Sequence, residues 1–350
     1  MTEVDYIVVG CGLAGVAFCE QLRKADQSFV VFDDDSQKSS SVAAGIYNPV
    51  VLKRFTQVWK AKAQLELAMP YYHDLENLLE VKLNHKLNVY RKFASIEEQN
   101  EWFVASDKPV LCDFMHSEIL KNDQKELIAP YGFGKVLHSG RIDTRLLMER
   151  YRLFLKSTHR LKEERFQYDL LSPVNHGVVY ASIKAKHIVF TEGFGLKENP
   201  LLPNSPIVGL KGEMLIVKAP TLKLEVILKS SVFVVPLGED LYWVGATYEH
   251  QDKTHNISEA AKVQLVLKLK TLLNCEFEVV QQVAGIRPTT KDRRPLVGSH
   301  PSMANVYILN GMGTRGVMIS PYVAQQLYDH IEYQTDLDTE INLKRFKAFR

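Results

Sequence analysis

The chain opens with apolar runs separated by short glycine-rich or acidic turns. Val4–Val9 is an apolar run of strand length, and Ala14, Phe18 and Leu22 recur at the spacing of one helical face. Phe29–Phe32 is a second apolar run. Two strands joined by a helix in this way predict an α/β unit, with a ligand site where the strands end.

Further along the chain, runs of strand length and apolar stripes with helical spacing recur. Residues 56–80 carry an apolar helical stripe in which Pro70 predicts a kink or a break. Asp143 or Thr144 is positioned to cap the following helix. The region from about 84 has short mixed segments, including the polar stretch 96–107, and 206–249 is rich in strands. The other expected strands are 166–170, 177–182, 187–190 and 306–310, and the other expected helices are 146–156, 259–274 and 319–331.

A glycine loop joins the first strand to the first helix. Its sequence is Gly10-Cys11-Gly12-Leu13-Ala14-Gly15, which has the GxGxxG spacing. Such a loop permits a tight turn, lets the backbone approach a pyrophosphate, and places the phosphates on a helix N-terminus. Asp33 directly follows the second strand and fits a ribose-binding acid best, with Asp34 as the alternative one residue further on. The pattern therefore predicts a dinucleotide site.

Two other segments are suited to a flat ring. The small residues of Ser41-Val42-Ala43-Ala44-Gly45 suit a loop against which a ring lies. Gly311-Met312-Gly313-Thr314-Arg315-Gly316 forms a second glycine loop between strand and helix. The N–H groups of that loop and the positive end of its helix suit an electron-rich ring carbonyl, such as the pyrimidine edge of a flavin. A packing turn is the alternative interpretation.

One arginine, Arg287, ends the apolar stretch 284–286. An arginine at the end of a buried strand favours a bidentate carboxylate partner. From spacing alone, this partner is equally well a substrate or an internal Asp or Glu.

Length and composition indicate the kind of protein to which the chain belongs. At 350 residues, two domains are expected, and 46% hydrophobic with 24% charged residues is typical of a globular enzyme. The net charge of +2 neither argues for nucleic acid as a partner nor excludes it, and lysines 262, 268 and 270 suit a solvated helix face better than an RNA surface. The four cysteines show no metal spacing, so we expect no metal and a cytoplasmic location. No leader and no membrane-spanning run are visible.

Taken together, these motifs resemble the FAD-dependent D-amino-acid oxidase superfamily, nearest to its glycine/sarcosine oxidase-like amine oxidases. The resemblance runs the length of the chain. Besides the glycine loops, Ser41–Gly45 and the 285–288 segment, it rests on the segments 140–143, 191–194, 210–213, 235–236 and 244–249.

The resemblance implies an α/β fold with a Rossmann-like FAD-binding domain and an inserted α+β substrate domain built on a large antiparallel sheet. FAD-binding segments are expected at 1–83, 136–203 and 288–350, and substrate segments at 84–135 and 204–287. The implied FAD contacts are Gly10, Gly12, Leu13, Ala14, Gly15, Asp33, Asp34, Ser41, Ala43, Ala44, Gly45, Phe166 (near adenine), Thr191, Glu192, Gly193, Gly311, Met312, Gly313, Thr314, Arg315 and Gly316.

The resemblance also implies the chemistry, which is oxidation of a C–N bond in an amino acid or secondary amine by hydride transfer to flavin. Arg287 would bind the substrate carboxylate, and Tyr248 and Arg54 complete the expected catalytic set. Arg54, beside Lys53, would add positive charge near the ring; a salt bridge at the domain seam is the alternative. FAD is expected to be non-covalent, since no cysteine matches an attachment site, and O2 or another acceptor would reoxidise it. The alternatives are a tRNA wobble-uridine oxidase, like the flavin half of the bifunctional methylaminomethyl-uridine enzyme, and a flavin-binding protein without turnover.

Overall fold

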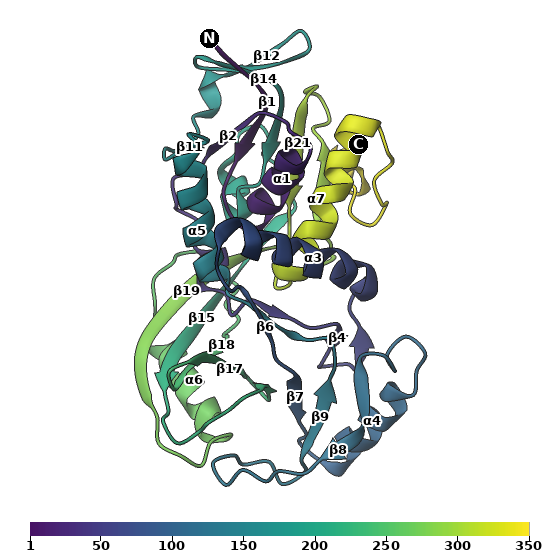
Figure 1. The fold of residues 1–350 in the computed structure, drawn as a ribbon, viewed down its shortest axis with the longest axis vertical. Coiled ribbons are helices and arrows are strands. Elements are labelled where there is room, and N and C mark those ends of the chain that lie inside the picture. Colours follow the sequence, from purple (N-terminus) through teal and green to yellow (C-terminus); the bar gives the residue numbers. More distant parts are fainter. Residues whose placement is uncertain (350) are drawn as a thin grey trace.

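A mainly parallel sheet of eight strands forms one half of the molecule in the computed structural model, which describes residues 1–349 (Figure 1). Its order is β11-β2-β1-β14-β13-β12, and β21 pairs with both β14 and β20. The strands are β1 (Thr2–Val9), β2 (Phe29–Phe32), β11 (Leu161–Lys162), β12 (Leu171–Val174), β13 (Gly177–Tyr180), β14 (Ile183–Phe190), β20 (Leu296–Ser299) and β21 (Val306–Asn310). Strands β1, β2, β14 and β21 run parallel, so their carboxyl ends meet at one edge.

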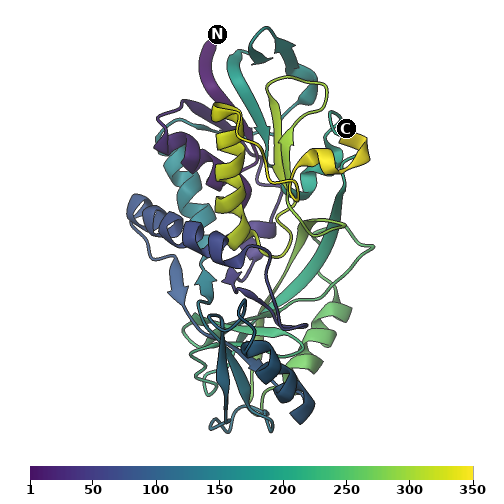
Figure 2. The same ribbon diagram turned by 90° about the vertical axis from the view of Figure 1, so that its right-hand side faces the viewer.

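Helices cover one face of this sheet. They are α1 (Leu13–Lys24), α3 (Ala61–Leu79), α5 (Thr144–Ser157) and α7 (Gly316–Tyr333). Because strand side chains alternate, Tyr6 and Val8 pack in the cluster with these helices, and Ile7 and Val9 pack in the cluster on the other face. Figure 2 shows the helical layer beside the sheet.

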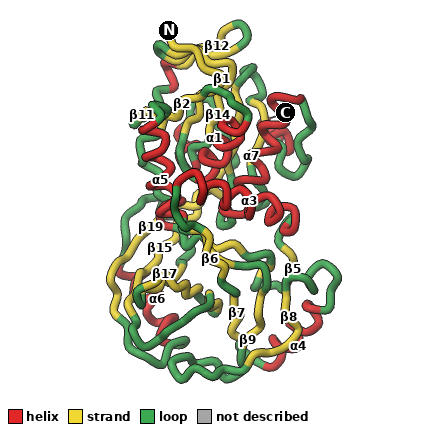
Figure 3. The backbone as a smooth tube through the Cα atoms, viewed as in Figure 1, coloured by secondary structure: helices red, strands yellow, loops and turns green. Residues whose placement is uncertain are grey.

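A second eight-stranded sheet forms the other half, in the order β19-β15-β18-β17-β16-β7-β9-β8 (Figure 3). All its neighbouring strands are antiparallel except β16 and β7. The strands are β7 (Val89–Lys92), β8 (Met115–Leu120), β9 (Phe133–Val136), β15 (Ile207–Lys218), β16 (Ile227–Lys229), β17 (Phe233–Gly238), β18 (Leu241–Gly245) and β19 (Glu278–Thr290). Helix α6 (Glu259–Lys270) contacts β15, and α4 (Ile96–Ser106) contacts β8.

The expected fold class, a nucleotide-binding α/β half with an inserted large sheet, is therefore confirmed. The domain boundaries stay a prediction. The strands β9 and β19 of the second sheet end at Val136 and Thr290, whereas the predicted substrate segments end at 135 and 287. The remaining short elements are α2 (Ser39–Val42), β3 (Ile46–Tyr47), β4 (Val50–Val51), β5 (Thr56–Gln57), β6 (Asn84–Lys86), β10 (Gly140–Ile142) and the 3-10 turns η1 (Tyr168–Leu170), η2 (Gly193–Glu198), η3 (Leu343–Arg345) and η4 (Lys347–Phe349).

Three local expectations change. Pro70 lies within α3 without ending it. The strand expected at 166–170 is wrong, because Phe166 lies in a loop and η1 follows it. The stretch 96–107 contains α4, whose N-cap Ser95 accepts a hydrogen bond from the Glu98 N–H at 3.4 Å. No helix among residues 1–349 has both the length and the hydropathy needed to span a bilayer.

Candidate active site

A cavity of about 590 Å³ lies where β1, β2, β14 and β21 end, and β15, β18 and β19 of the second sheet line its opposite side. It lies at the edge that the strand pattern predicts. Most of the predicted FAD contacts line it, namely Gly10, Gly12, Leu13, Ala14, Asp33, Asp34, Ser41, Ala43, Ala44, Gly45, Phe166, Thr191, Glu192, Gly193, Met312, Gly313, Thr314, Arg315 and Gly316. Gly15 and Gly311 are absent from the lining.

The glycines of the first loop differ in what surrounds them. A Cβ on Gly15 would lie 2.1 Å from the Gly10 carbonyl oxygen, so Gly15 lets the helix start against the loop. A Cβ on Gly12 would meet only the Ser40 Oγ, at 3.1 Å. Gly12 lines the cavity, and this side-chain oxygen is the one atom that crowds its backbone, so the position suits the approach of a pyrophosphate.

Asp33 is held in place at the end of β2. Its carboxylate accepts hydrogen bonds from the Cys11 N–H at 2.6 Å and the Asp35 N–H at 2.8 Å. It also forms an ion pair with Arg152 of α5. Arg152 lines the cavity, and sequence reasoning missed it because the pairing depends on how α5 packs.

At the same end of the cavity, aromatic rings and a half-buried carboxyl meet. Phe166 stacks on Tyr180 with ring centroids 4.2 Å apart. Glu192 accepts hydrogen bonds from the Tyr168 hydroxyl and from Asn199 Nδ2, the latter at 2.9 Å. Burial raises the pKa of Glu192 to about 7, although both hydrogen bonds favour the charged form.

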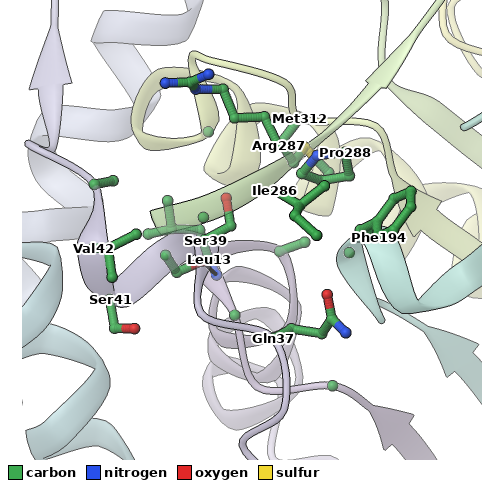
Figure 4. Close-up of a pocket in the computed structure, with 18 of the residues that line it drawn as sticks. Leu13, Gln37, Ser39, Ser41, Val42, Phe194, Ile286, Arg287, Pro288 and Met312 are labelled. Atoms are coloured by element: carbon green, nitrogen blue, oxygen red, sulfur yellow. Dashed lines mark hydrogen bonds between the residues drawn. The ribbon is translucent and has the colours of Figure 1, made fainter. Parts of the chain in front are cut away.

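Arg287 extends from β19 into the other end of the cavity, as Figure 4 shows. Its guanidinium lies over Gly212, where an added Cβ would be 2.2 Å from Nη2. The Tyr248 ring covers it, with the Arg287 Cζ 5.3 Å from the ring centroid. Within residues 1–349 the buried Nη1 has no hydrogen-bond partner, and burial lowers the pKa of the group. An internal Asp or Glu does not pair with Arg287 among these residues.

Arg315 lies on the neighbouring loop. Its Nη1 donates to the Asn48 carbonyl oxygen at 3.1 Å. Burial lowers the pKa of Arg315 to about 10. The loop is joined to β19 by a hydrogen bond from the Gly313 N–H to the Pro288 carbonyl oxygen, at 2.8 Å. Arg315 and Arg287 therefore reach the cavity from two backbone segments that are hydrogen-bonded together.

Arg54 is not brought into the cavity. It lies on the exposed turn between β4 and β5, and Lys53 beside it is exposed as well. The next residue, Phe55, is buried against Trp102 of α4, with the two ring centroids 5.3 Å apart. This contact ties the turn to α4, which is a packing contact that the sequence pattern does not indicate.

The loop after β18 carries Tyr248 and is fastened to β15 through the buried Lys211 and Glu213 and the partly exposed Asp252. Lys211, 1% exposed, contacts the Asp252 carboxylate and the Asn256 carbonyl oxygen and lies 3.8 Å from Glu213. The Glu213 carboxylate accepts two hydrogen bonds from Ser258, both at 2.8 Å. We call residues 246–258 the anchored loop. Two of its members that sequence reasoning missed, Lys253 and His255, also line the cavity.

A family model described as "FAD dependent oxidoreductase" (DAO) matches residues 5–330. The chain belongs to this family. Glycine oxidase of Bacillus subtilis (strain 168) is 23% identical, over 99% of this chain and 96% of its own length. The structure of glycine oxidase from Geobacillus kaustophilus matches with a TM-score of 0.82 at 19% identity, covering 99% of this chain and 100% of that one. A bifunctional tRNA 5-methylaminomethyl-2-thiouridine biosynthesis protein of Nitrosospira multiformis is 24% identical over 41% of this chain and 25% of its own length.

The family fixes the cofactor and the class of enzyme. The protein is an FAD-dependent oxidoreductase, which confirms the predicted cofactor and resemblance. The residues fit the group, because the backbone at Gly12 is open to the cavity and Asp33 lies beside the glycine loop. FAD supplies a two-electron acceptor when bound.

Proposed function

We propose that the protein oxidises the C–N bond of a small amino acid or secondary amine and that Arg287 binds the substrate carboxylate. The observation that supports this role is the buried Nη1 of Arg287, which lacks a partner within residues 1–349. A guanidinium with a buried N–H group that lacks a partner is costly, and a substrate carboxylate would compensate it through two parallel hydrogen bonds.

In this proposal the protein's main contribution is orientation. Gly212 leaves room for the guanidinium and Tyr248 covers it, so the fork has little freedom. A carboxylate held there fixes the neighbouring carbon. That carbon would lose a hydride to the bound FAD while the amine nitrogen supplies its lone pair, and water would hydrolyse the resulting iminium to a carbonyl and ammonia or an amine. We propose O2 as the final acceptor, which takes up two electrons and two protons to give H2O2.

The test is anaerobic flavin reduction by Arg287→Ala with matched substrates. We expect FAD to be retained. The free energy of binding glycine, sarcosine or proline, obtained from the concentration dependence of flavin reduction, should weaken by about 2–5 kcal/mol, the range for a buried charge pair that loses one partner. The decarboxylated analogues, such as pyrrolidine for proline, should change little. Arg54→Ala is the control, because that side chain is exposed and outside the cavity.

Equal losses on both members of each pair would contradict the proposal and make Arg287 structural. Modified tRNA belongs in the same substrate panel, since a tRNA-modifying relative matches part of the chain. Reduction by tRNA alone would replace the amino-acid proposal. Non-covalent FAD and a cytoplasmic location remain predictions; release of FAD on acid precipitation tests the former.

A further inference from the structure

The acidic groups of the cavity are gathered at one end. Within residues 1–349, the Asp and Glu residues in its lining come from the end of β2, the loop before Phe166 and the segment after β14. They are Asp33, Asp34, Asp35, Glu164, Glu192 and Glu198. The arginines there are paired, Arg152 with Asp33 and Arg165 with Glu198 at 2.6 Å.

The other end holds Arg287 and Arg315, and neither forms an ion pair with an Asp or Glu in the described chain. Both are half-buried, and the Tyr248 hydroxyl acts electrostatically on both guanidinium groups. The hydrogen bond between Gly313 and Pro288 holds their backbone segments together. Two guanidinium groups that lack a carboxylate partner among the described residues therefore face one end of a single cavity. Lys253 of the anchored loop also lines the cavity, but its ammonium donates to the Gly209 and His250 carbonyl oxygens.

Arg315 has donors to spare. A guanidinium carries five N–H groups, and the Asn48 carbonyl oxygen takes one of them. That bond orients the side chain without neutralising it. Since an unpaired half-buried charge is costly, an anionic group beside Arg315 would be stabilised.

We propose that Arg315 binds a second anionic group of the substrate. The substrate class is then a small amine with two acidic groups, one held by Arg287 and the other by Arg315. This inference rests on the proposed function, because it takes Arg287 as the site of the first carboxylate. The electron-rich edge of the flavin is another source of negative charge near Arg315, and the experiment separates the two.

The experiment uses the FAD-loaded protein and carboxylates that are not oxidised. Acetate and propionate serve as monoacids, and malonate, succinate and glutarate as diacids. Binding is followed by the change in flavin absorbance. We expect the best diacid to bind about tenfold or more tightly than the monoacids, the effect of one further charge-assisted hydrogen bond.

Arg315→Met should remove this preference and leave monoacid binding unchanged, Arg287→Met should weaken both classes, and Arg54→Met should alter neither. The affinity of the flavin for sulfite, which rises with positive charge near the ring, is measured in parallel. An Arg315→Met protein that keeps the diacid preference, or that loses sulfite affinity while both acid classes weaken equally, would overturn the inference.

Two further outcomes are distinguishable. If Arg315→Met does not retain FAD, Arg315→Lys replaces it; a point charge without the fork should keep part of the preference, and an unchanged preference overturns the inference. If no carboxylate perturbs the flavin and Arg287→Met changes nothing, the proposed function fails first. If Arg287→Met weakens carboxylate binding but the wild-type protein binds diacids no more tightly than monoacids, only the role of Arg315 is contradicted.

Discussion

The two ends of the cavity treat charge differently. At the end where β2 finishes, which we propose holds the nucleotide and call the nucleotide end, Arg152 pairs with Asp33, and Glu192 is hydrogen-bonded to Tyr168 and Asn199. At the opposite end, which we propose holds the substrate and call the substrate end, Arg287 and Arg315 have no carboxylate partner within residues 1–349. The nucleotide end is thus largely satisfied within the protein, whereas the substrate end needs an anion from outside. Substitutions at the first end should act on FAD retention and folding, and those at the second on ligand affinity.

The largest expected effect is on FAD binding. Gly12→Val places a side chain in the part of the cavity that the pyrophosphate needs, so we expect the purified protein to lack FAD entirely. The backbone φ of −83° at Gly12 suits any residue, so the thermal midpoint of the apoprotein should stay near that of wild-type apoprotein. Flavin absorbance and a thermal melt measure the two quantities.

Gly15→Ala is the matched comparison on the same loop. Its Cβ would lie 2.1 Å from the Gly10 carbonyl oxygen, which is backbone and cannot turn aside. This variant should lose FAD and apoprotein stability together. Full flavin occupancy in Gly12→Val would show that the glycine loop is not the nucleotide site.

The next largest effect is a loss of stability in the anchored loop. The charged groups that fasten it form ion pairs, whereas Arg287 and Arg315 form none within residues 1–349. Lys211→Met leaves the buried Glu213 carboxylate without its cation, and removing one partner of a buried pair costs about 3–5 kcal/mol. The lost contact with Asp252 should add little, because that side chain is 41% exposed. We expect denaturant unfolding to show a loss of that order and KM to rise, because the loop carries Tyr248.

Lys223→Met provides the control for this loss, since Lys223 pairs with Asp240 on an exposed surface and should cost about 1 kcal/mol or less. Equal losses in the two variants would argue that the buried pair does not hold the anchored loop.

A smaller effect is expected when the Arg287 guanidinium is displaced but keeps its charge. Gly212→Ala adds a Cβ 2.2 Å from the Arg287 Nη2, and the flexible side chain can move where backbone cannot. We expect FAD to be retained and carboxylate affinity to fall about tenfold, a loss of about 1.4 kcal/mol. Gly209→Ala on the same strand meets the Phe194 ring instead, so it should spare carboxylate binding.

Local patterns predicted the parts of the site that depend on backbone. The first glycine loop, the strands at 29–32 and 306–310 and the second glycine loop follow from short-range spacing, and the structure has the strands at these bounds. The α4 helix was missed although its signal is present: Ser95 and Glu98 have the spacing of a capping box, and Glu98 accepts from the Ala94 N–H at 2.7 Å.

Other features depend on contacts between segments far apart in the chain. Arg152 reaches Asp33 across 119 positions, and Lys211 reaches Asp252 across 41, so no local spacing indicates either pair. For Arg54 the sequence pointed to a contact that the structure does not have. Its positive charge suggested a place near the flavin ring, but the neighbouring Phe55 packs on Trp102 and the turn lies outside the cavity. At Phe166, apolar residues suggested a strand, but stacking on Tyr180 accounts for its burial.

The smallest expected effect is a pH dependence at the nucleotide end. The folded-state pKa of Glu192 is raised from 4.5 to about 7 by burial, so the folded protein holds a proton that the unfolded chain releases between these values. This proton-linked stability is present below pH 4.5 and is lost as the pH rises through 7. Apoprotein melts should therefore show a lower thermal midpoint at pH 8 than at pH 5.5, and Glu192→Gln, which cannot ionise, should reduce that difference. Glu118→Gln is the control, because Glu118 is exposed on β8 in the other half of the molecule. A wild-type difference that persists undiminished in Glu192→Gln would assign the titration to another group.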